Sequence, residues 1–390
     1  MTQDHRYDVL VCGGGIAGVA AALQAAREGQ RTALLEKTIL LGGLATAGLV
    51  WFYPPLYDGR GVKVTAGLPE ELLHLCCRYG PGRTAATVIG HDWTMFSPAS
   101  FITALDEALL EAGVDLWLDT LVCAPLLEGD RVRGVEAETK GGRIAFHAAV
   151  VIDATGDADL AHRAGAECVE AGNLLTLWIV QASMARARRA IERRDGTLLT
   201  EMVMLGDELT DREAWASSKT WSGLTAEGVT AFVRAGHQLL RGHYAAVHAS
   251  GSTRDQFPVT LPAIPQFRTT RRIVGRSLVA AGGYDQSRAD SVGLVADCRA
   301  PERIWEIPYG ALVPEKIGGL LVAGRCMATE EDPWEATRII TGVAVAGQAA
   351  GLAAAVAAAR GLTPSEVPVT ALQERLRVLG VPCHYSELGG

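Results

Sequence analysis

The feature of this chain that most constrains its fold is a glycine pattern close to its N-terminus. A short apolar run over residues 7–12 leads directly into Gly13-x-Gly15-x-x-Gly18, and a helical stretch over 19–28 follows. Gly13 permits a tight turn, Gly15 lets the backbone approach a pyrophosphate, and Gly18 lets the helix close on the strand. The amide groups at the start of that helix then point toward the phosphates. This spacing predicts an α/β fold that binds a dinucleotide.

An acidic residue stands where such a fold needs one. Residues 32–36 form the next apolar strand, and its last residue, Glu36, comes eighteen residues after Gly18. A carboxylate there accepts hydrogen bonds from ribose hydroxyls. NAD and FAD share this arrangement, so the pattern by itself leaves the choice between them open. The predicted contacts in this region are Gly13, Gly15, Ile16, Ala17, Gly18, Glu36 and Lys37.

Charge narrows the class of partner. The 390 residues include 36 basic and 44 acidic side chains, a formal net charge of −8, and no dense basic stripe stands out. Nucleic acid and anionic membranes are therefore not expected as partners.

Cysteine usage and apolar runs bear on location. The eight cysteines include no C-x-x-C pair, so we expect neither a metal site nor a disulfide framework. The chain enters its first strand almost at once, which leaves no room for a signal peptide. The uncharged run over 339–359 is as long as a membrane span, but its Ala, Gly and Val content favours a buried, closely packed helix. These features predict a cytoplasmic protein without a membrane span.

Later segments extend this fold and divide it. Ser97 and Pro98 are typical of the N-cap and first residue of a helix, which Gly113 ends. Further apolar strands are predicted over 115–119, 131–139, 148–153 and 319–323, and a strand pair over 292–297 and 304–309. Together the pieces predict a discontinuous, Rossmann-like FAD/NAD(P)-binding domain with an inserted β-rich substrate domain. The predicted binding domain comprises residues 1–50, 96–170 and 310–362, the substrate or cap domain 51–95 and 171–309, and the C-terminal helix and tail 363–390.

Four stretches resemble one flavoprotein family. They are GGGIAGVAAALQAAREGQRTALLEK with LGGLATAGLV, then VVIDATGDADLAHRAGA, then FRTTRRIVG, and finally IPYGALVPEKIGGLLVAGRCMA through WEATRIITGVAVAGQAAGLAAA. In this order they are similar to FAD-dependent oxidoreductases related to the flavin module of heterodisulfide reductase. A more distant resemblance is to the flavoproteins of fumarate reductase and succinate dehydrogenase. The stretches span nearly the whole chain, and the resemblance implies that the cofactor is FAD.

The resemblance also implies further cofactor contacts. Gly42 and Gly43 would let the backbone pass beside the ribityl chain and flavin, and Thr46 would hydrogen-bond there. The resemblance places the main chain of Val122 at the adenine and the Ala154-Thr155-Gly156 turn over the cofactor. The helix that starts near Thr341 would direct its positive end at the isoalloxazine ring. The contacts implied in this way are Gly42, Gly43, Thr46, Val122, Ala154, Thr155, Gly156, Gly324, Arg325, Thr341 and Gly342.

The pair Gly324-Arg325 departs from the related patterns. In those patterns an acid commonly follows the glycine and accepts hydrogen bonds from the ribityl hydroxyls. A guanidinium has no acceptor, so Arg325 cannot take that role. Pairing with the pyrophosphate and neutralisation of the reduced flavin remain as alternatives.

Three charged residues are candidates for the substrate side. Strand periodicity places Arg272 on the same face as Arg268, where a guanidinium could hold a carboxylate, although a solvated basic edge fits the same pattern. Arg338 precedes the helix that the resemblance places at the flavin, so its charge would stabilise a reduced ring. Glu335, three residues earlier, is either a general base or only a charge at a helix N-terminus.

Two features of the sequence bear on the reaction. Only one Gly-x-Gly-x-x-Gly is present, and no cysteine spacing fits an iron–sulfur cluster. We therefore expect a dehydrogenase or oxidase whose flavin is reduced by a small polar metabolite. The alternatives are an electron-transfer subunit that works with a redox partner protein, and an NADPH-using flavin monooxygenase. The electron acceptor, the oligomeric state and any covalent flavin link stay open.

Overall fold

A seven-stranded sheet forms the centre of the computed structural model, which describes residues 5–80, 90–206, 220–251, 254–300 and 302–388. Strand β1 (His5–Cys12) pairs in parallel with β2 (Thr32–Leu35) on one side and β8 (Gly142–Asp153) on the other. The strand order is β5-β2-β1-β8-β7-β6, and β16 lies in parallel beside the end of β8. The remaining strands are β5 (Asp115–Trp117), β6 (Leu121–Glu128), β7 (Arg131–Thr139) and β16 (Leu320–Val322).

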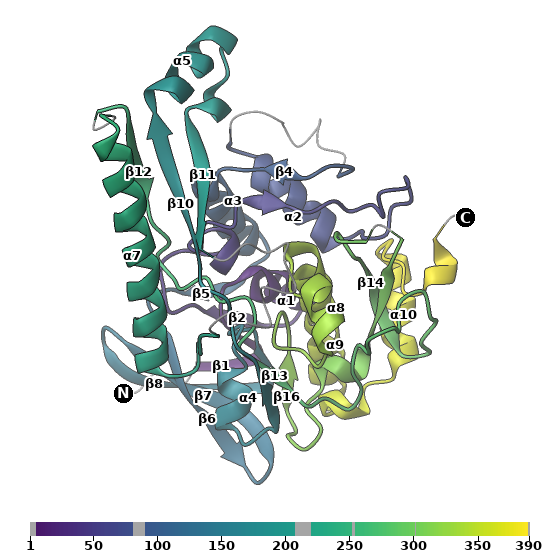
Figure 1. Cartoon of the computed structure of the whole chain (residues 1–390). Helices are drawn as coiled ribbons and strands as arrows, with labels where there is room; N and C mark the ends of the chain where they lie inside the picture. Colours follow the sequence, from purple (N-terminus) through teal and green to yellow (C-terminus); the bar gives the residue numbers. More distant parts are fainter. Residues whose placement is uncertain (1–4, 81–89, 207–219, 252–253, 301, 389–390) are drawn as a thin grey trace.

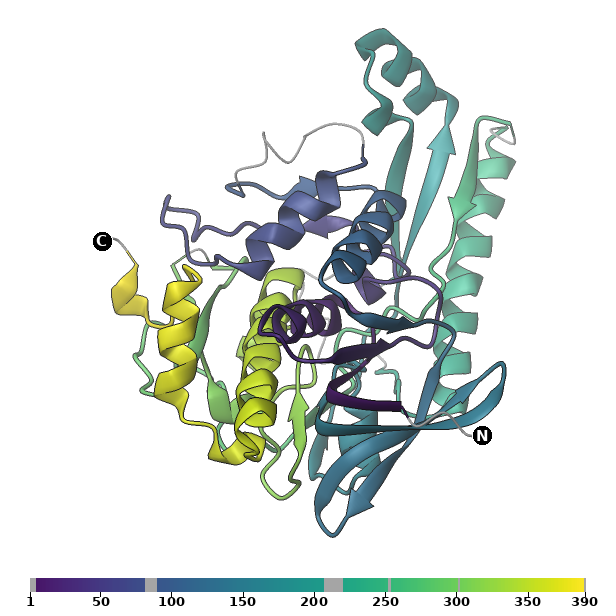
Figure 2. The ribbon, with the colours of Figure 1, turned by 180° about the vertical axis from the view of Figure 1, so that it is seen from behind.

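Two helices rich in small residues pack against each other beside this sheet. They are α1 (Ile16–Arg27) and α9 (Ile340–Arg360), which lie close together in both views (Figures 1 and 2). A side chain added at Gly347 or Gly351 would meet the α1 backbone, because its Cβ would stand 2.3 Å from the carbonyl oxygen of Ala17 or Ala21. Helix α9 is the one described helix long and apolar enough to cross a membrane, and most of it is buried inside the protein. The predicted buried helix is thus confirmed.

Other elements surround this centre. Helix α3 (Pro98–Glu111) begins as predicted, because the Ser97 side chain accepts a hydrogen bond from the amide of Ser100. The predicted strand pair is confirmed as β14 (Ser291–Ala296) and β15 (Ile304–Pro308), which pair antiparallel. Helix α10 (Val369–Val378) lies beside that pair at the edge of the molecule (Figure 1). The remaining elements here are α2 (Leu68–Cys77), α4 (Asp159–Arg163), α8 (Glu331–Thr337), β3 (Phe52–Tyr53), β4 (Thr94–Met95), β9 (Cys168–Glu170) and β13 (Arg271–Ile273).

An arm projects from this body, as both views show (Figures 1 and 2). It consists of a three-stranded antiparallel sheet in the order β11-β10-β12, a short helix α5 at its tip, and the long helix α7 along one face. Its own apolar core is small, built on Leu177, Ile179 and Tyr244. The bounds are β10 (Thr176–Ser183), α5 (Met184–Arg193), β11 (Thr200–Gly206), α7 (Ala226–Ala249) and β12 (Gln256–Thr260).

The segments that were predicted to form the substrate domain lie partly in the body and partly in the arm. Strands β14 and β15 and helix α2 contribute to the large core of the body. The arm is formed within 171–309, where helix α7 is longer than any of its strands. The domain boundaries themselves stay a prediction.

Candidate cofactor and active site

The loop between β1 and α1 owes its shape to three glycines. Gly13 has a φ of 107°, and a Cβ there would lie 2.5 Å from the carbonyl oxygen of Ala154. A Cβ on Gly18 would lie 1.8 Å from the carbonyl oxygen of Gly13, so only glycine lets α1 close on the loop. Gly15 differs, because its Cβ would meet nothing within 4 Å. Its open side faces the space where a phosphate can approach the backbone.

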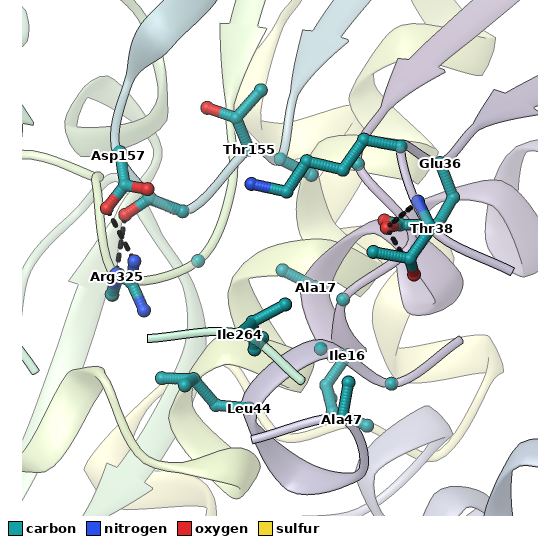
Figure 3. Close-up of a pocket in the computed structure, with 18 of the residues that line it drawn as sticks. Ile16, Ala17, Glu36, Thr38, Leu44, Ala47, Thr155, Asp157, Ile264 and Arg325 are labelled. Atoms are coloured by element: carbon teal, nitrogen blue, oxygen red, sulfur yellow. Dashed lines mark hydrogen bonds and ion pairs between the residues drawn. The ribbon is translucent and has the colours of Figure 1, made fainter. Parts of the chain in front are cut away.

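A cavity of about 1330 Å³, part of it open to solvent, begins at this loop. Figure 3 shows Glu36 and Thr38 on one side of it and Asp157 and Arg325 on the other. The lining contains fourteen of the predicted cofactor residues, namely Gly13, Gly15, Ile16, Ala17, Glu36, Lys37, Gly42, Gly43, Val122, Ala154, Thr155, Gly156, Gly324 and Arg325. Gly18, Thr46, Thr341 and Gly342 are predicted contacts that do not line it.

Glu36 is buried at the end of β2 and already holds two loops together. One carboxylate oxygen accepts from the Gly14 amide at 2.7 Å, and the other from the amide and hydroxyl of Thr38 at 2.8 and 2.9 Å. A carboxylate offers about four acceptor positions, so one is left for a ribose hydroxyl.

The second glycine loop closes against the first. The amide of Gly42, whose φ is 95°, donates to the carbonyl oxygen of Gly14 at 2.8 Å, and a Cβ on Gly43 would lie 3.1 Å from the Cα of Gly15. Thr46 does not reach the cavity, since its hydroxyl donates to the carbonyl of Leu41 within the same loop. Its hydroxyl thus shapes the loop, and the expected contact of Thr46 with the cofactor stays a prediction.

The turn after β8 rests on a buried carboxylate. Asp153 accepts from the amide and hydroxyl of Thr155 at 3.0 and 2.7 Å and from the amide of Ala161 at 2.8 Å. Burial raises the pKa of Asp153, and these hydrogen bonds oppose that effect. Val122 lines the cavity nearby, where its carbonyl accepts a hydrogen bond from the guanidinium of Arg163 at 3.2 Å.

Arg325 forms an ion pair that the sequence did not predict. Its guanidinium donates to Asp157, to the carbonyl of Gly156 at 2.7 Å and to the carbonyl of Phe267 at 3.1 Å. The hydroxyl of Thr270 donates to the same carboxylate at 2.6 Å. Burial would raise the pKa of Asp157, but the charge of Arg325 and these hydrogen bonds hold it below its usual value. A carboxylate is therefore present beside Gly324 and Arg325, although it comes from another segment of the chain.

The start of α9 forms another part of the wall. Arg338, Ile340 and Val343 line the cavity, whereas Thr341 and Gly342 are not among the lining residues. A Cβ on Gly342 would lie 2.6 Å from the carbonyl oxygen of Thr337, so this glycine lets α8 end against α9. The contacts predicted at Thr341 and Gly342 stay predictions, although their neighbours Ile340 and Val343 are the residues that line the cavity here.

Glu335 does not line the cavity, and its carboxylate pairs with the guanidinium of Arg338 through two hydrogen bonds. Burial would raise the pKa of Glu335, but Arg338 first, and then Arg268 and Arg299, bring it below the usual value. A carboxylate held in this way is a weak proton acceptor. The pairing lets Glu335 orient Arg338, and its role as a general base stays a prediction.

Arg272 also lies outside the cavity lining. Its guanidinium stands 5.6 Å from the ring centre of Trp334, and burial lowers its pKa. Trp334 in turn donates from its indole nitrogen to the carbonyl of Arg325 at 2.5 Å. Arg272 thus packs against Trp334 and is not among the residues that line the cavity, and its contact with a substrate stays a prediction. Arg268 lies on a different aromatic surface, with its guanidinium 5.9 Å from the ring centre of Trp178.

A Rossmann-like sheet with a glycine-rich first turn and a deep cavity at the strand ends defines the class of dinucleotide-binding α/β proteins. The sequence pattern of the family described as FAD dependent oxidoreductase matches residues 8–216 and 175–376, and the chain belongs to this family. Its cofactor is accordingly FAD, and the cavity residues fit that group, since Gly15 leaves open space at the turn and Glu36 keeps an acceptor position. The narrower resemblance to heterodisulfide reductase stays a prediction.

Curated relatives are similar over part of their length. The chain is 28% identical over 188 residues to a digeranylgeranylglycerophospholipid reductase of Methanoculleus marisnigri, a match that covers 42% of each protein. A protein of the same description from Methanosphaerula palustris is 29% identical over 170 residues, or 38% of each chain. The match thus spans about two fifths of the length of these relatives.

Solved structures are similar at low identity. A geranylgeranyl bacteriochlorophyll reductase-like protein of Thermoplasma acidophilum is 15% identical, with a TM-score of 0.48 over 96% of this chain and 84% of that one. A p-nitrophenol 4-monooxygenase of Pseudomonas putida is 12% identical, with a TM-score of 0.49 over 95% and 84% of the two chains. Likeness at this level carries no information about activity.

Proposed function

We propose that this chain oxidises a small polar metabolite with an anionic group, as a dehydrogenase or oxidase whose FAD is reduced by the substrate. The observation that carries the proposal is the position of Arg338, which lines the cavity immediately before the first turn of α9. When bound, FAD supplies the hydride acceptor. The protein supplies binding, orientation and charge.

The glycine loops and two acids assign the cofactor's orientation in this proposal. The amides after Gly15 would hold the pyrophosphate, and the open acceptor position of Glu36 would accept from the ribose. Asp157 would accept from the ribityl hydroxyls, the role that related patterns give to an acid directly after the glycine that corresponds to Gly324. With these roles the cofactor would be held between the Glu36 side and the Arg338 side of the cavity.

Positive charge at the α9 end supports both the redox role and the choice of substrate. A helix N-terminus contributes about half an elementary charge, and Arg338 adds a guanidinium beside it. Fixed positive charge stabilises the negative charge that develops when a flavin accepts a hydride. Arg268 also lowers the pKa of the Glu335 carboxyl, although it does not line the cavity. The guanidinium of Arg338 suits a substrate carboxylate or phosphate.

Anaerobic reduction tests this function directly. The holo-protein is incubated with fractionated metabolite extract without oxygen, and loss of flavin absorbance near its visible maximum is followed. We expect at least one fraction of polar, anionic metabolites to bleach the flavin, and the same fraction to act more slowly on Arg338→Met. Bleaching by NADPH alone would contradict the proposal in favour of a monooxygenase. Bleaching only with an iron–sulfur protein present would contradict it in favour of an electron-transfer subunit.

A further inference from the structure

The tip of the arm is strongly basic, in contrast to the rest of the chain. We define the tip as residues 184–199 together with 254–257. Residues 184–199 contain five arginines against two acids, whereas the whole chain has a net charge of −8. Arg186 is engaged with Glu201 at 3.3 Å, and the other arginines of this stretch are exposed. The exposed arginines are Arg188, Arg189, Arg193 and Arg194.

Large apolar side chains are exposed among these arginines. Met184 is 62% exposed and Ile191 is 76% exposed. They are seven residues apart, which is two helical turns, so they lie on the same face of α5. Arg188 lies between them on that face, while Ala190 is the one buried residue of the helix. A helix that combines arginines with an exposed apolar face is typical of proteins that bind at membrane surfaces.

The β12 side of the tip continues the same surface. The amide of Met184 donates to the carbonyl of Asp255 at 2.8 Å, which places the exposed Arg254 beside the start of α5. Phe257, also exposed, lies opposite Ala182 in the β10–β12 pairing. The tip therefore presents arginine and apolar side chains from two separate segments of the chain.

The arm holds the tip away from the acidic body. Strand β10 has eight residues and spans about 26 Å at roughly 3.3 Å per residue. The Debye length at physiological salt is about 8 Å, so the charge of the body is largely screened at the tip. The net charge of the whole chain is thus a poor guide to what this end of the molecule attracts.

We propose that the arm tip binds the surface of an anionic lipid bilayer, with its arginines at the head groups and Met184, Ile191 and Phe257 at the acyl boundary. Attachment through a few basic and apolar side chains of this kind is peripheral and reversible. The proposal departs from the expectation, drawn from net charge alone, that anionic membranes are not partners.

Two other occupants fit the tip less well. In a two-fold dimer the same patch meets itself, so its arginines would lie opposite their own copies and repel one another. Nucleic acid matches the charge but is bound mainly through its phosphates, which leaves the exposed Met184 and Ile191 without a role.

Vesicle flotation with the FAD-loaded protein tests the proposal. The vesicles contain either phosphatidylcholine alone or equal parts of phosphatidylcholine and phosphatidylglycerol. We expect the protein to float with the anionic vesicles at low salt, and to be released by high salt. Flotation with neither type of vesicle, or equally with both, overturns the proposal.

Matched variants separate the tip from general surface charge. Replacing Arg188, Arg189 and Arg193 by Gln is expected to weaken partition at least about tenfold, since each basic residue near an anionic surface contributes severalfold. The same change at Arg31, Arg60 and Arg360, which are exposed on the body, is the control and leaves partition within about twofold. Equal effects of the two sets overturn the proposal. Retained FAD and an unchanged melting temperature show that each variant is folded.

A second pair of variants tests the apolar part. Met184→Ser with Ile191→Ser is expected to weaken partition severalfold, while Leu110→Ser with Val378→Ser is the control, at 59% and 75% exposure on the body. Sedimentation and binding to a DNA duplex are measured on the same proteins. A dimer that only the tip variants dissociate, without vesicle binding, overturns the proposal in favour of self-association. Tip-dependent binding of DNA without vesicle binding overturns it in favour of nucleic acid.

Discussion

Helices α9 and α7 are similar in length but differ in how they pack. Helix α9 has 21 residues, most of them buried, and its backbone approaches that of α1 at Gly347 and Gly351. Helix α7 has 24 residues, of which Phe232, Gly236 and Tyr244 are buried. The first helix is held by close contact between backbones, the second by a few side chains on a narrow sheet.

This difference shows which part of the molecule has to be positioned precisely. The start of α9 forms part of the cavity wall through Arg338, so a small shift of the helix would move a charge relative to the cofactor. The arm carries its proposed contacts at a distant tip, where position matters less. Regions with few buried contacts open locally at lower free energy than the core. We expect the body to be the rigid part of the molecule and the arm the part that opens first.

The largest effect is expected from one added methyl group in α9. A Cβ on Gly351 would stand 2.3 Å from the carbonyl oxygen of Ala21, so Gly351→Ala has to push α1 and α9 apart. We expect the free energy of unfolding to fall by about 3 kcal/mol, at the upper end of the range for overpacked cores. Chemical denaturation of the apoprotein measures it. A decrease in the free energy of unfolding below about 1 kcal/mol would mean that the two helices can move apart at little cost in free energy.

An added side chain at Gly15 should affect the cofactor instead of the fold. A Cβ there meets no protein atom within 4 Å, and its φ of −66° suits any residue, so Gly15→Val can fold. The side chain would occupy the space where phosphate approaches the backbone, and we expect FAD affinity to fall at least about 100-fold, or about 2.7 kcal/mol. The control is Gly242→Val on α7, where a Cβ also meets nothing within 4 Å. If purified Gly15→Val contained as much FAD as the wild-type protein, this loop would not be part of the cofactor site.

The part of the site that the sequence predicted is the part determined by local backbone geometry. The turn at Gly13 and the contact at Gly18 require glycine whatever the rest of the chain does, so spacing alone identified them. The partner of Arg325 was missed because Asp157 is 168 residues away along the chain, and only the sheet topology brings the two together. An acid directly after Gly156 was the signal that could have found it.

Three other differences between the expectations and the structure have separate causes. Thr341 and Gly342 were expected at the cavity from the resemblance, but the packing of α8 on α9 turns Ile340 and Val343 toward it instead. The basic tip was missed because net charge averages over the whole chain and hides a local reversal. Helix α7 was missed because it lies in a segment that was predicted to be β-rich, and only a few of its residues are buried.

Arg338 and Glu335 form an ion pair at the start of α9. Substitutions of these two residues are expected to shift the reduction potential of the flavin in opposite directions. Arg338→Met keeps much of the stem volume and removes a positive charge at the cavity wall, so the two-electron potential should fall by tens of millivolts. About 30 mV corresponds to roughly 1.4 kcal/mol for two electrons. Glu335→Gln leaves the charge of Arg338 uncompensated, so the potential should rise. Spectroelectrochemical titration at low salt measures both, and two unchanged potentials would show that the pair lies away from the flavin.

The smallest effect is expected from a glycine-to-alanine substitution in α7, the same type of change that should disrupt the packing of α9. A Cβ on Gly236 would stand 3.6 Å or more from Leu177, an ordinary contact, so the sheet need not move. Alanine is favoured over glycine inside a helix by about 0.8 to 1 kcal/mol, and Gly236→Ala should therefore stabilise the arm by about that amount. Gly242→Ala, on the exposed side of the same helix, isolates the contribution of helix propensity. Hydrogen exchange of the α7 amides is the suitable measurement, because local opening of the arm escapes a global melting curve. If Gly236→Ala instead weakens protection while Gly242→Ala strengthens it, α7 packs on its sheet as tightly as α9 packs on α1, and the contrast between rigid body and loosely held arm fails.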